Sequence, residues 1–273
     1  MPLAKLYVEG DLDAAIYNRI FDGVTVLQGS GKRTIKPQAE RDRDPKHAGI
    51  NAGYLRDRDF DFIPPESAEI PTIDAESNGT PYGWRLNRHE LENYLIDPLV
   101  LNSALGIDRN YWEEKLVQAA IAIKHYQIAR STIGYVRSQL PPYYKLETTP
   151  KKVKELRLPG DLSEESCFQW CHESVKAFRE KIEPVLMVST IESEIAQRKQ
   201  SYSDELLSSA PYALIWCSGK DLLAALDQST MDSVKCSSTG ELIKRLLEWV
   251  IKNPQTFLLH FPELQQIRTK LLA

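Results

Sequence analysis

Four carboxylates near the N-terminus have the residue types and the spacing that suit metal chemistry. Glu9 and Asp13 stand in the segment V-E-G-D-L-D, and Asp57 and Asp59 stand in Y-L-R-D-R-D-F-D. If they converge, each pair would repel by about 4 kcal/mol at 4 Å and an effective dielectric of 20 unless a cation neutralises them. Hard oxygen ligands of this kind favour Mg²⁺ or Mn²⁺. The alternative is that each residue is only a helix cap or a loop charge, since Asp is common in both places.

The elements that must position these carboxylates are strands followed by turns and helices. Residues 3–9, 24–29 and 50–57 form apolar runs typical of buried strands, and a helical pattern begins after Gly10. Alternation of strands and helices predicts an α/β fold with a parallel sheet and right-handed crossovers. Ligands of such sheets bind outside the carboxyl ends of the strands. Glu9 and Asp13 are expected there, and Asp57 and Asp59 are expected to project from one side of an extended segment.

The order of these motifs resembles the TOPRIM domain of topoisomerases, DnaG-type primases and OLD-family nucleases. That domain has a glutamate after its first strand, which Glu9 matches, and a D-x-D after a later strand, which Asp57 and Asp59 match; Asp13 looks like the additional acid of the OLD-type variant. The stretch R-D-R-D-F-D, followed by R-H-E-L-E-N-Y-L-I-D-P, more closely resembles a TOPRIM-like family that occurs with OLD-type or ABC-type ATPases in bacterial phage defence, including the nuclease subunit of the PARIS system.

The resemblance covers about the first 100 residues and the segment 219–226. It implies a TOPRIM-like, Rossmann-like parallel sheet flanked by helices, with a helical insertion. It also implies a Mg²⁺- or Mn²⁺-dependent nuclease that hydrolyses phosphodiesters of DNA or RNA, transfer RNA included, and that acts in phage defence with an ATPase partner. The rival is a non-catalytic TOPRIM-like binding or regulatory subunit of an ATPase complex.

Two further residues have both a catalytic and a structural interpretation. Glu92, in H-E-L-E-N-Y-L, is either a metal ligand or general base, or a charge at a helix N-terminus that the dipole favours. Lys220 follows the apolar run 211–219, which reads as a strand that returns to the sheet. OLD-type nucleases assign a lysine to neutralising the phosphate, and Lys220 is the candidate for that role. Otherwise it is an exposed lysine that opens a helix; against that interpretation, a cation in the first turn opposes the helix dipole, so an anion nearby would help to explain it.

The net charge of −4 conceals a basic block. Residues 115–157 hold nine Lys and Arg against two Glu, so this block carries +7 and the rest of the chain −11. Tyrosines at 126, 135, 143 and 144 are interleaved with these charges, a combination suited to phosphate contact and base stacking. The alternative is the solvated face of long helices. Lys32 and Arg33 lie in Q-G-S-G-K-R-T, which fails the P-loop pattern but suits phosphate contact.

Cysteine usage and hydropathy limit the class of protein. The four cysteines form no C-x-x-C pair, which fits a reducing compartment. Cys167, Cys171 and His172 suggest zinc, but Cys171 falls on an apolar stripe of helical spacing and is expected to be buried. No apolar run approaches the roughly 20 residues that span a bilayer, and the N-terminus has no secretory h-region. The expected location is the cytoplasm, with no membrane contact.

Three regions are expected along the chain. Residues 1–108 are predicted to form the TOPRIM-like domain, residues 109–210 a helical region with a basic connector, and residues 211–273 a returning strand and C-terminal helices. The two terminal amphipathic segments either pack into the core or form a surface for an ATPase or a second copy of the chain. Their apolar residues are Leu242, Leu246, Trp249, Leu264, Ile267 and Leu271.

Overall fold

The computed structural model describes residues 3–140 and 164–273. The chain divides into two compact units, one formed by Met1–Gln127 with Tyr202–Ala273 and the other by Ile128–Ser201. The first unit contains the sheet and the residues with candidate chemistry. None of the helices in the described part of the chain combines the length and apolar character that crossing a lipid bilayer requires.

The first unit is built on a five-stranded sheet in the order β2-β1-β3-β5-β4. Its strands are β1 (Lys5–Val8), β2 (Thr25–Gln28), β3 (Ala52–Arg56), β4 (Thr72–Ser77) and β5 (Thr80–Arg85). The pairs β1–β2, β1–β3 and β3–β5 are parallel, and only β4 is antiparallel to its neighbour β5. The predicted α/β class with a mostly parallel sheet flanked by helices is therefore confirmed.

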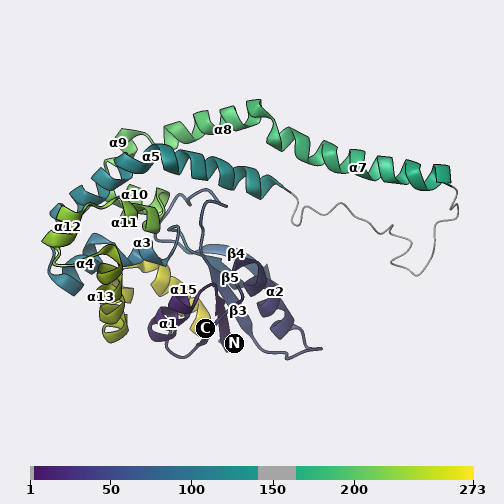
Figure 1. Ribbon diagram of the computed structural model, residues 1–273. Helices are drawn as coiled ribbons and strands as arrows, with labels where there is room; N and C mark the ends of the chain where they lie inside the picture. The colour runs from purple at the N-terminus through teal and green to yellow at the C-terminus, as the bar shows by residue number, and fades with distance from the viewer. Residues whose placement is uncertain (1–2, 141–163) are drawn as a thin grey trace. The chain divides into compact units, whose positions relative to one another are not determined.

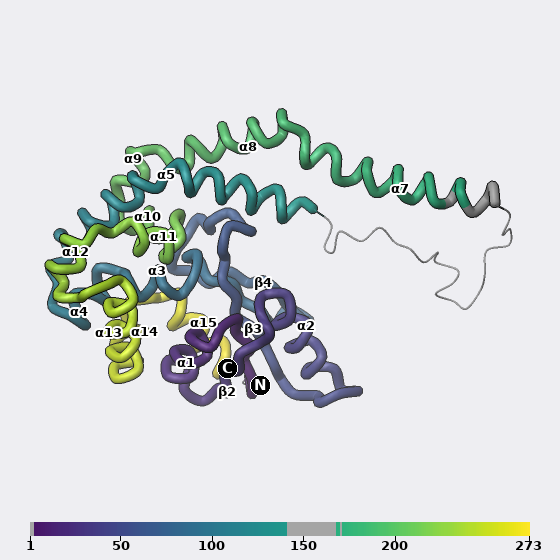
Figure 2. Tube along the Cα trace, viewed as in Figure 1, coloured from purple at the N-terminus to yellow at the C-terminus, as the bar shows by residue number. Residues whose placement is uncertain are grey.

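Helices cover both faces of this sheet (Figure 1). The helix α2 (Lys32–Arg43) packs its Ile35 and Ala39 onto Tyr7, Tyr54 and Tyr82. Because side chains alternate along a strand, Leu6 and Val8 point to the opposite face. On that side lie α1 (Asp11–Ile20) and α15 (Pro262–Leu272). The N-terminal segment and α15 lie side by side (Figures 1 and 2). The Leu3 N–H donates a hydrogen bond to the Leu271 carbonyl at 2.7 Å.

The strand order creates a topological switch point between β1 and β3. The chain leaves β1 through α1 toward β2, whereas it leaves β3 toward β5 on the other side. The two connections diverge at this point, and open α/β sheets bind ligands in the crevice outside the carboxyl ends of their strands at such a switch point.

Short helices complete the first unit around the carboxyl edge of the sheet. They are α3 (Leu91–Leu95), α4 (Pro98–Leu105), the start of α5 (Arg109–Gln139), α9 (Asp204–Leu207), α10 (Ala210–Trp216), α11 (Gly219–Ala225), α12 (Gln228–Ser233), α13 (Thr239–Lys252) and α14 (Pro254–Leu259). In α13 and α15 the predicted apolar stripes are in the core, because Leu242, Leu246, Leu264, Ile267 and Leu271 are fully buried. These five side chains are consequently not a partner surface in this structure.

The prediction of a returning strand at 211–219 is wrong, because this segment contains helix α10. Ser209 precedes the helix and Pro211 lies in its first turn, where a fixed φ and a missing N–H are tolerated. Ala213 and Leu214 are buried, and a short apolar run does not distinguish a buried helix from a buried strand. The strand β5 is interior, and the edges of the sheet are β2 and β4.

The second unit consists of the C-terminal part of α5 with α7 (Glu164–Leu186) and α8 (Val188–Ser201). The apolar stripe near Cys171 is helical as predicted, but its burial was predicted wrongly, since Cys171, Phe168 and Val175 are exposed. Helical periodicity identifies an apolar face without saying whether another element covers it. The predicted basic connector, residues 141–160 with Tyr143 and Tyr144, lies outside the described residues.

Candidate functional site

Glu9 and Asp57 meet at the switch point of the sheet. Glu9 directly follows β1, Asp57 directly follows β3, and these strands are hydrogen-bonded neighbours with Tyr7 opposite Tyr54. The backbone N–H of Asp57 donates to Oε1 of Glu9 at 3.1 Å. The two motifs therefore come together across 48 residues of sequence, at the sheet edge where the strand order predicts a ligand site.

Asp13 joins them from the first turn of α1. Its Oδ2 accepts a hydrogen bond from the Gly10 N–H at 2.9 Å, which caps the helix that follows Glu9. The pKa of Asp13 is raised to about 6, chiefly by burial and also by the charges of Glu92 and Glu90, whereas the hydrogen bond from Gly10 and the charge of Lys220 lower it. Asp13 thus faces the start of α3 as well as the switch point.

The carboxyls of this group resist ionisation. Burial raises the pKa of Glu9 to about 7, with added repulsion from Asp59 and Asp13, while Lys32 and the Asp57 N–H act in the opposite direction. Burial also raises the pKa of Asp57 well above its ordinary value, and Asp13, Glu9 and Asp59 add to the rise. We refer to Glu9, Asp13, Asp57 and Asp59 as the acidic site. Its mutual repulsion is what a bound cation would relieve.

Asp59 reaches the acidic site by a route that the sequence did not predict. The strand β3 ends at Arg56, and Asp59 has a left-handed backbone with φ +48° rather than an extended one. Its N–H donates to the His89 carbonyl at 3.0 Å, and its Oδ2 lies 2.7 Å from Nζ of Lys32. The same ammonium lies 2.8 Å from Oδ2 of Asp61. The direction of the Asp59 side chain is therefore set by a turn after β3 and not by the alternation of side chains along a strand.

Lys220 lies beside α3 rather than at a strand end. Its ammonium contacts the carboxylates of Glu90 and Glu92, the latter at 3.2 Å, and these anions raise its pKa although desolvation opposes them. The dipole argument for an anion near this lysine is therefore confirmed. Glu92 lies in the first turn of α3, where both its catalytic and its dipole interpretation stay open.

Glu90 is the residue whose importance the sequence understated. It is buried, and its Oε1 accepts hydrogen bonds from the Ser218 hydroxyl at 2.7 Å and from the Lys220 N–H at 3.0 Å. Its other oxygen accepts from the ammonium of Lys220. The signal that could have found it is the first glutamate of H-E-L-E, which stands at the N-cap of α3, where a negative charge is favoured.

A close approach of α3 and α11 fixes this arrangement. A Cβ atom at Gly219 would lie 2.7 Å from the Asn93 backbone nitrogen, so no other residue fits there without a shift. The Asn93 side chain accepts from the Gly219 N–H at 3.0 Å and donates to the carbonyls of Leu214 and Cys217 at 2.9 Å each. The position of Lys220 relative to the acidic site is set by these buried contacts.

The arginines of R-D-R-D-F-D have structural roles. Arg58 is fully buried and donates to the carbonyls of Asn87 and Phe62 at 3.0 Å each, and also to that of Ile215. Arg56 pairs with Asp74 at 2.7 Å. His89 is buried, and its ring bonds to the Trp216 carbonyl at 2.9 Å. In this segment the two arginines bind neighbouring parts of the fold, whereas Asp57 and Asp59 belong to the acidic site.

The donor atoms fit a hard divalent cation, although they do not enclose one. Within residues 3–140 and 164–273, no group of three or more His, Cys, Asp or Glu side chains is arranged to hold a metal ion. Nevertheless, neither carboxylate oxygen of Asp57 accepts a hydrogen bond from a described residue, and its neighbours offer only oxygen ligands. For the four carboxylates to surround a metal ion, their side chains would have to rotate. This applies most of all to Asp59, which forms an ion pair with Lys32.

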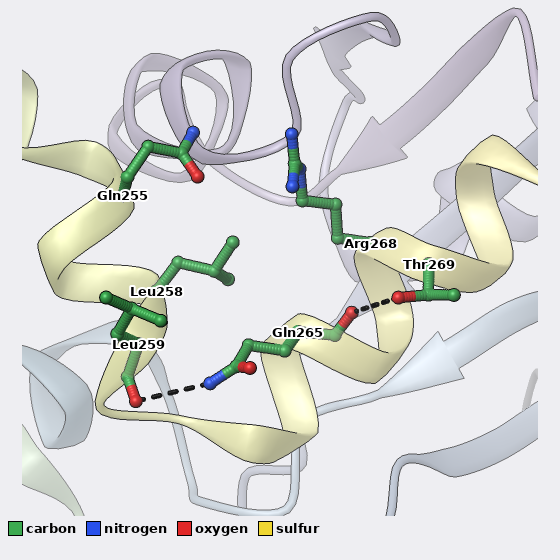
Figure 3. Close-up of a pocket in the computed structure, with 6 residues that line it drawn as sticks. All are labelled: Gln255, Leu258, Leu259, Gln265, Arg268 and Thr269. Carbon is green, nitrogen blue, oxygen red and sulfur yellow. Dashed lines mark hydrogen bonds between the residues drawn. The ribbon is translucent and has the colours of Figure 1, made fainter.

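A separate hollow of about 240 Å³ lies between α14 and α15 (Figure 3). Its lining residues are Gln255, Leu258, Leu259, Gln265, Arg268 and Thr269. None of them belongs to the acidic site or to the segments that contact Lys32 and Lys220. The hollow consequently contributes nothing to the chemistry at the sheet edge.

Comparison with known proteins leaves the acidic site as the basis for assigning function. No protein-family model matches the chain, and no curated protein matches it. What the residues and their geometry establish is an α/β unit with a mostly parallel sheet and an acidic site at the switch point between β1 and β3.

Proposed function

We propose that this protein is a Mg²⁺- or Mn²⁺-dependent nuclease with a TOPRIM-like sheet. The observation that carries the proposal is the hydrogen bond from the Asp57 N–H to Glu9, which joins the E-G-x-x-D and D-x-D segments at the switch point. Raised pKa values of Glu9, Asp13 and Asp57 support it, because carboxyls that repel one another in a partly dry crevice suit a divalent cation.

Glu9, Asp13, Asp57 and Asp59 would hold the cation. A bound divalent metal would lower the pKa of a water molecule and stabilise negative charge on phosphate oxygens. The side chains of the protein would position the substrate. Lys220, whose side chain is 61% exposed, is held by Glu90 and Glu92 at one side of the crevice and offers its ammonium to a phosphate.

Glu92 serves in this proposal chiefly as a positioning residue. Its carboxylate lies 3.2 Å from the Lys220 ammonium, and it raises the pKa of Asp13 through its charge. Together with the buried Glu90, it keeps the lysine beside the acidic site. An alternative role as a general base needs Glu92 to leave this ion pair when substrate binds.

The proposed substrate is a nucleic acid, either DNA or RNA, including transfer RNA. Within the described residues, α5 presents Lys115, Lys124, Arg130 and Arg137, and the whole basic block carries +7. A polyanion would be attracted to such a block. An ABC-type or OLD-type ATPase partner, homo-oligomer formation and a role in phage defence belong to the same proposal and rest on the resemblance in sequence.

The test is cleavage by Glu9→Gln and Asp57→Asn variants. Loss of a direct ligand is expected to lower Mg²⁺-dependent cleavage of DNA, RNA or transfer RNA by at least about 100-fold, since even indirect partners of a metal site cost 10- to 100-fold. Asp11→Asn is the matched control, because Asp11 is exposed in the same segment. Cleavage that survives in Glu9→Gln and Asp57→Asn would refute the assignment.

A non-catalytic TOPRIM-like binding or regulatory subunit is the second candidate function. Two observations favour it: the described carboxylates do not enclose a metal as they stand, and Lys32 forms an ion pair with Asp59. Assays of the chain alone and with a candidate ATPase separate the two functions. Cleavage by the chain alone supports the nuclease, whereas an ATPase whose turnover changes on binding a cleavage-inactive chain supports the regulatory subunit.

A further inference from the structure

Lys32 lies at the N-terminus of helix α2, where a positive charge is unfavourable, and its ammonium contacts two carboxylates. It is the first residue of α2, and Gly31 before it has φ +97°, a conformation that glycine adopts readily. A positive charge at a helix N-terminus opposes the macrodipole. The side chain is only 20% exposed, and its ammonium lies 2.7 Å from Asp59 and 2.8 Å from Asp61. These two carboxylates stabilise the lysine in that position.

Asp59 is held by its backbone, so only its side chain is free to exchange partners. Its N–H is bonded to the His89 carbonyl at 3.0 Å, and the neighbouring Phe60 ring packs on the His89 ring with centroids 4.3 Å apart. His89 is itself buried and anchored to Trp216. The turn therefore keeps Asp59 near the acidic site whether its carboxylate contacts Lys32 or a different cation.

We propose that Lys32 is a built-in counter-cation that occupies the D-x-D side of the acidic site, and that a divalent cation must displace it from Asp59 in order to bind. This inference rests on the proposed metal site and describes its regulation. An ammonium and a metal ion cannot both use Oδ2 of Asp59 at ligand distance, because their charges repel. Lys32 thus lowers the metal affinity of the resting protein and stabilises its metal-free form.

The experiment is Mn²⁺ titration of the full-length chain, followed by electron paramagnetic resonance, for wild type, Lys32→Met and Lys32→Arg. Removing the competing charge is expected to tighten Mn²⁺ binding by at least about 10-fold in Lys32→Met, while Lys32→Arg stays near wild type. In EDTA, Lys32→Met is expected to melt at a lower temperature than wild type, and saturating Mn²⁺ is expected to remove the difference. Lys36→Met is the control, because Lys36 lies on the same helix and, among the described residues, its ion pair is with Glu40, at 4.0 Å.

Two failures can be told apart. If wild type binds Mn²⁺ and Asp57→Asn does not, but Lys32→Met binds with unchanged or weaker affinity, then the role of Lys32 is refuted and the metal site stands. If neither wild type nor Lys32→Met binds Mn²⁺, the proposed metal site fails and the role of Lys32 fails with it.

Discussion

At the scale of single residues, the charged side chains follow the order of the strands. Lys32 comes after β2, Glu9 and Asp13 after β1, Asp57 and Asp59 after β3, and Glu90 and Glu92 after β5. Since β2, β1, β3 and β5 are successive neighbours in the sheet, these residues line one edge. The inner carboxyls have raised pKa values, and the lysines contact the outer ones.

This arrangement makes stability of the metal-free protein depend on pH. The pKa of Glu9 is raised from 4.5 to about 7, so the folded protein holds a proton that the unfolded chain releases. Stability is therefore lost as pH rises from about 4.5 through about 7. Between pH 5 and pH 8, wild type is expected to lose at least about 1 kcal/mol more than Glu9→Gln, which cannot titrate.

Urea unfolding in EDTA at the two pH values measures the difference. Asp11→Asn serves as the control, since it removes an exposed carboxylate of the same segment. Equal losses in wild type and Glu9→Gln would show that the folded protein does not hold the proton on Glu9.

At the scale of elements, the C-terminal helix is attached to the site by a buried carboxyl. Glu263, at the start of α15, accepts from the Asn87 N–H at 2.7 Å and from the Tyr94 hydroxyl at 2.6 Å. Asn87 follows β5, and Tyr94 lies in α3 beside Glu90 and Glu92. A residue near the end of the chain thus helps to fix the segment that holds Lys220.

Glu263→Ala is expected to destabilise the protein by about 3 kcal/mol, because it leaves two buried donors without an acceptor. Glu263→Gln should cost less, since its amide oxygen still accepts one bond. Gln266→Ala, on the same helix with an exposed contact to Glu69, is the control. Urea denaturation measures all three, and a loss in Glu263→Ala no greater than in Gln266→Ala would contradict the role of this carboxyl.

At the scale of the molecule, one unit carries the acidic site and the other carries much of the basic block. The second unit, Ile128–Ser201, interrupts the first between Gln127 and Tyr202. Lys124 and Asp204 lie close to these two junctions and form an ion pair at 2.7 Å within the first unit. The first unit is therefore joined across the interruption by its own contacts.

Replacement of residues 128–201 by a short Gly/Ser linker is expected to leave Mn²⁺ affinity unchanged and to weaken nucleic-acid binding by at least about 10-fold, because most of the basic block is removed. Fluorescence anisotropy with single-stranded DNA and RNA at several salt concentrations measures the loss, and the slope of log affinity against log salt should become shallower. Binding that keeps both its strength and its salt slope would exclude the second unit as a contact surface.

The sequence by itself determined the α/β class, the positions of β1, β2 and β3, and the convergence of Glu9, Asp13 and Asp57. These features follow from local pattern, since apolar runs define strands and parallel strands bring their carboxyl ends to one edge. The bound metal ion, the nuclease activity, the partners and the membership of a TOPRIM-like family are predictions from the sequence.

Tertiary structure alone decided what depends on contacts between distant segments. Within the run 211–219, residues up to Trp216 form α10, which packs against α3, and Asn93 donates to the carbonyls of Leu214 and Cys217. Glu90 is buried because α11 covers it, and Lys32 reaches Asp59 because the turn after β3 is left-handed. Periodicity records which face of a segment is apolar, whereas the fold decides what lies against it.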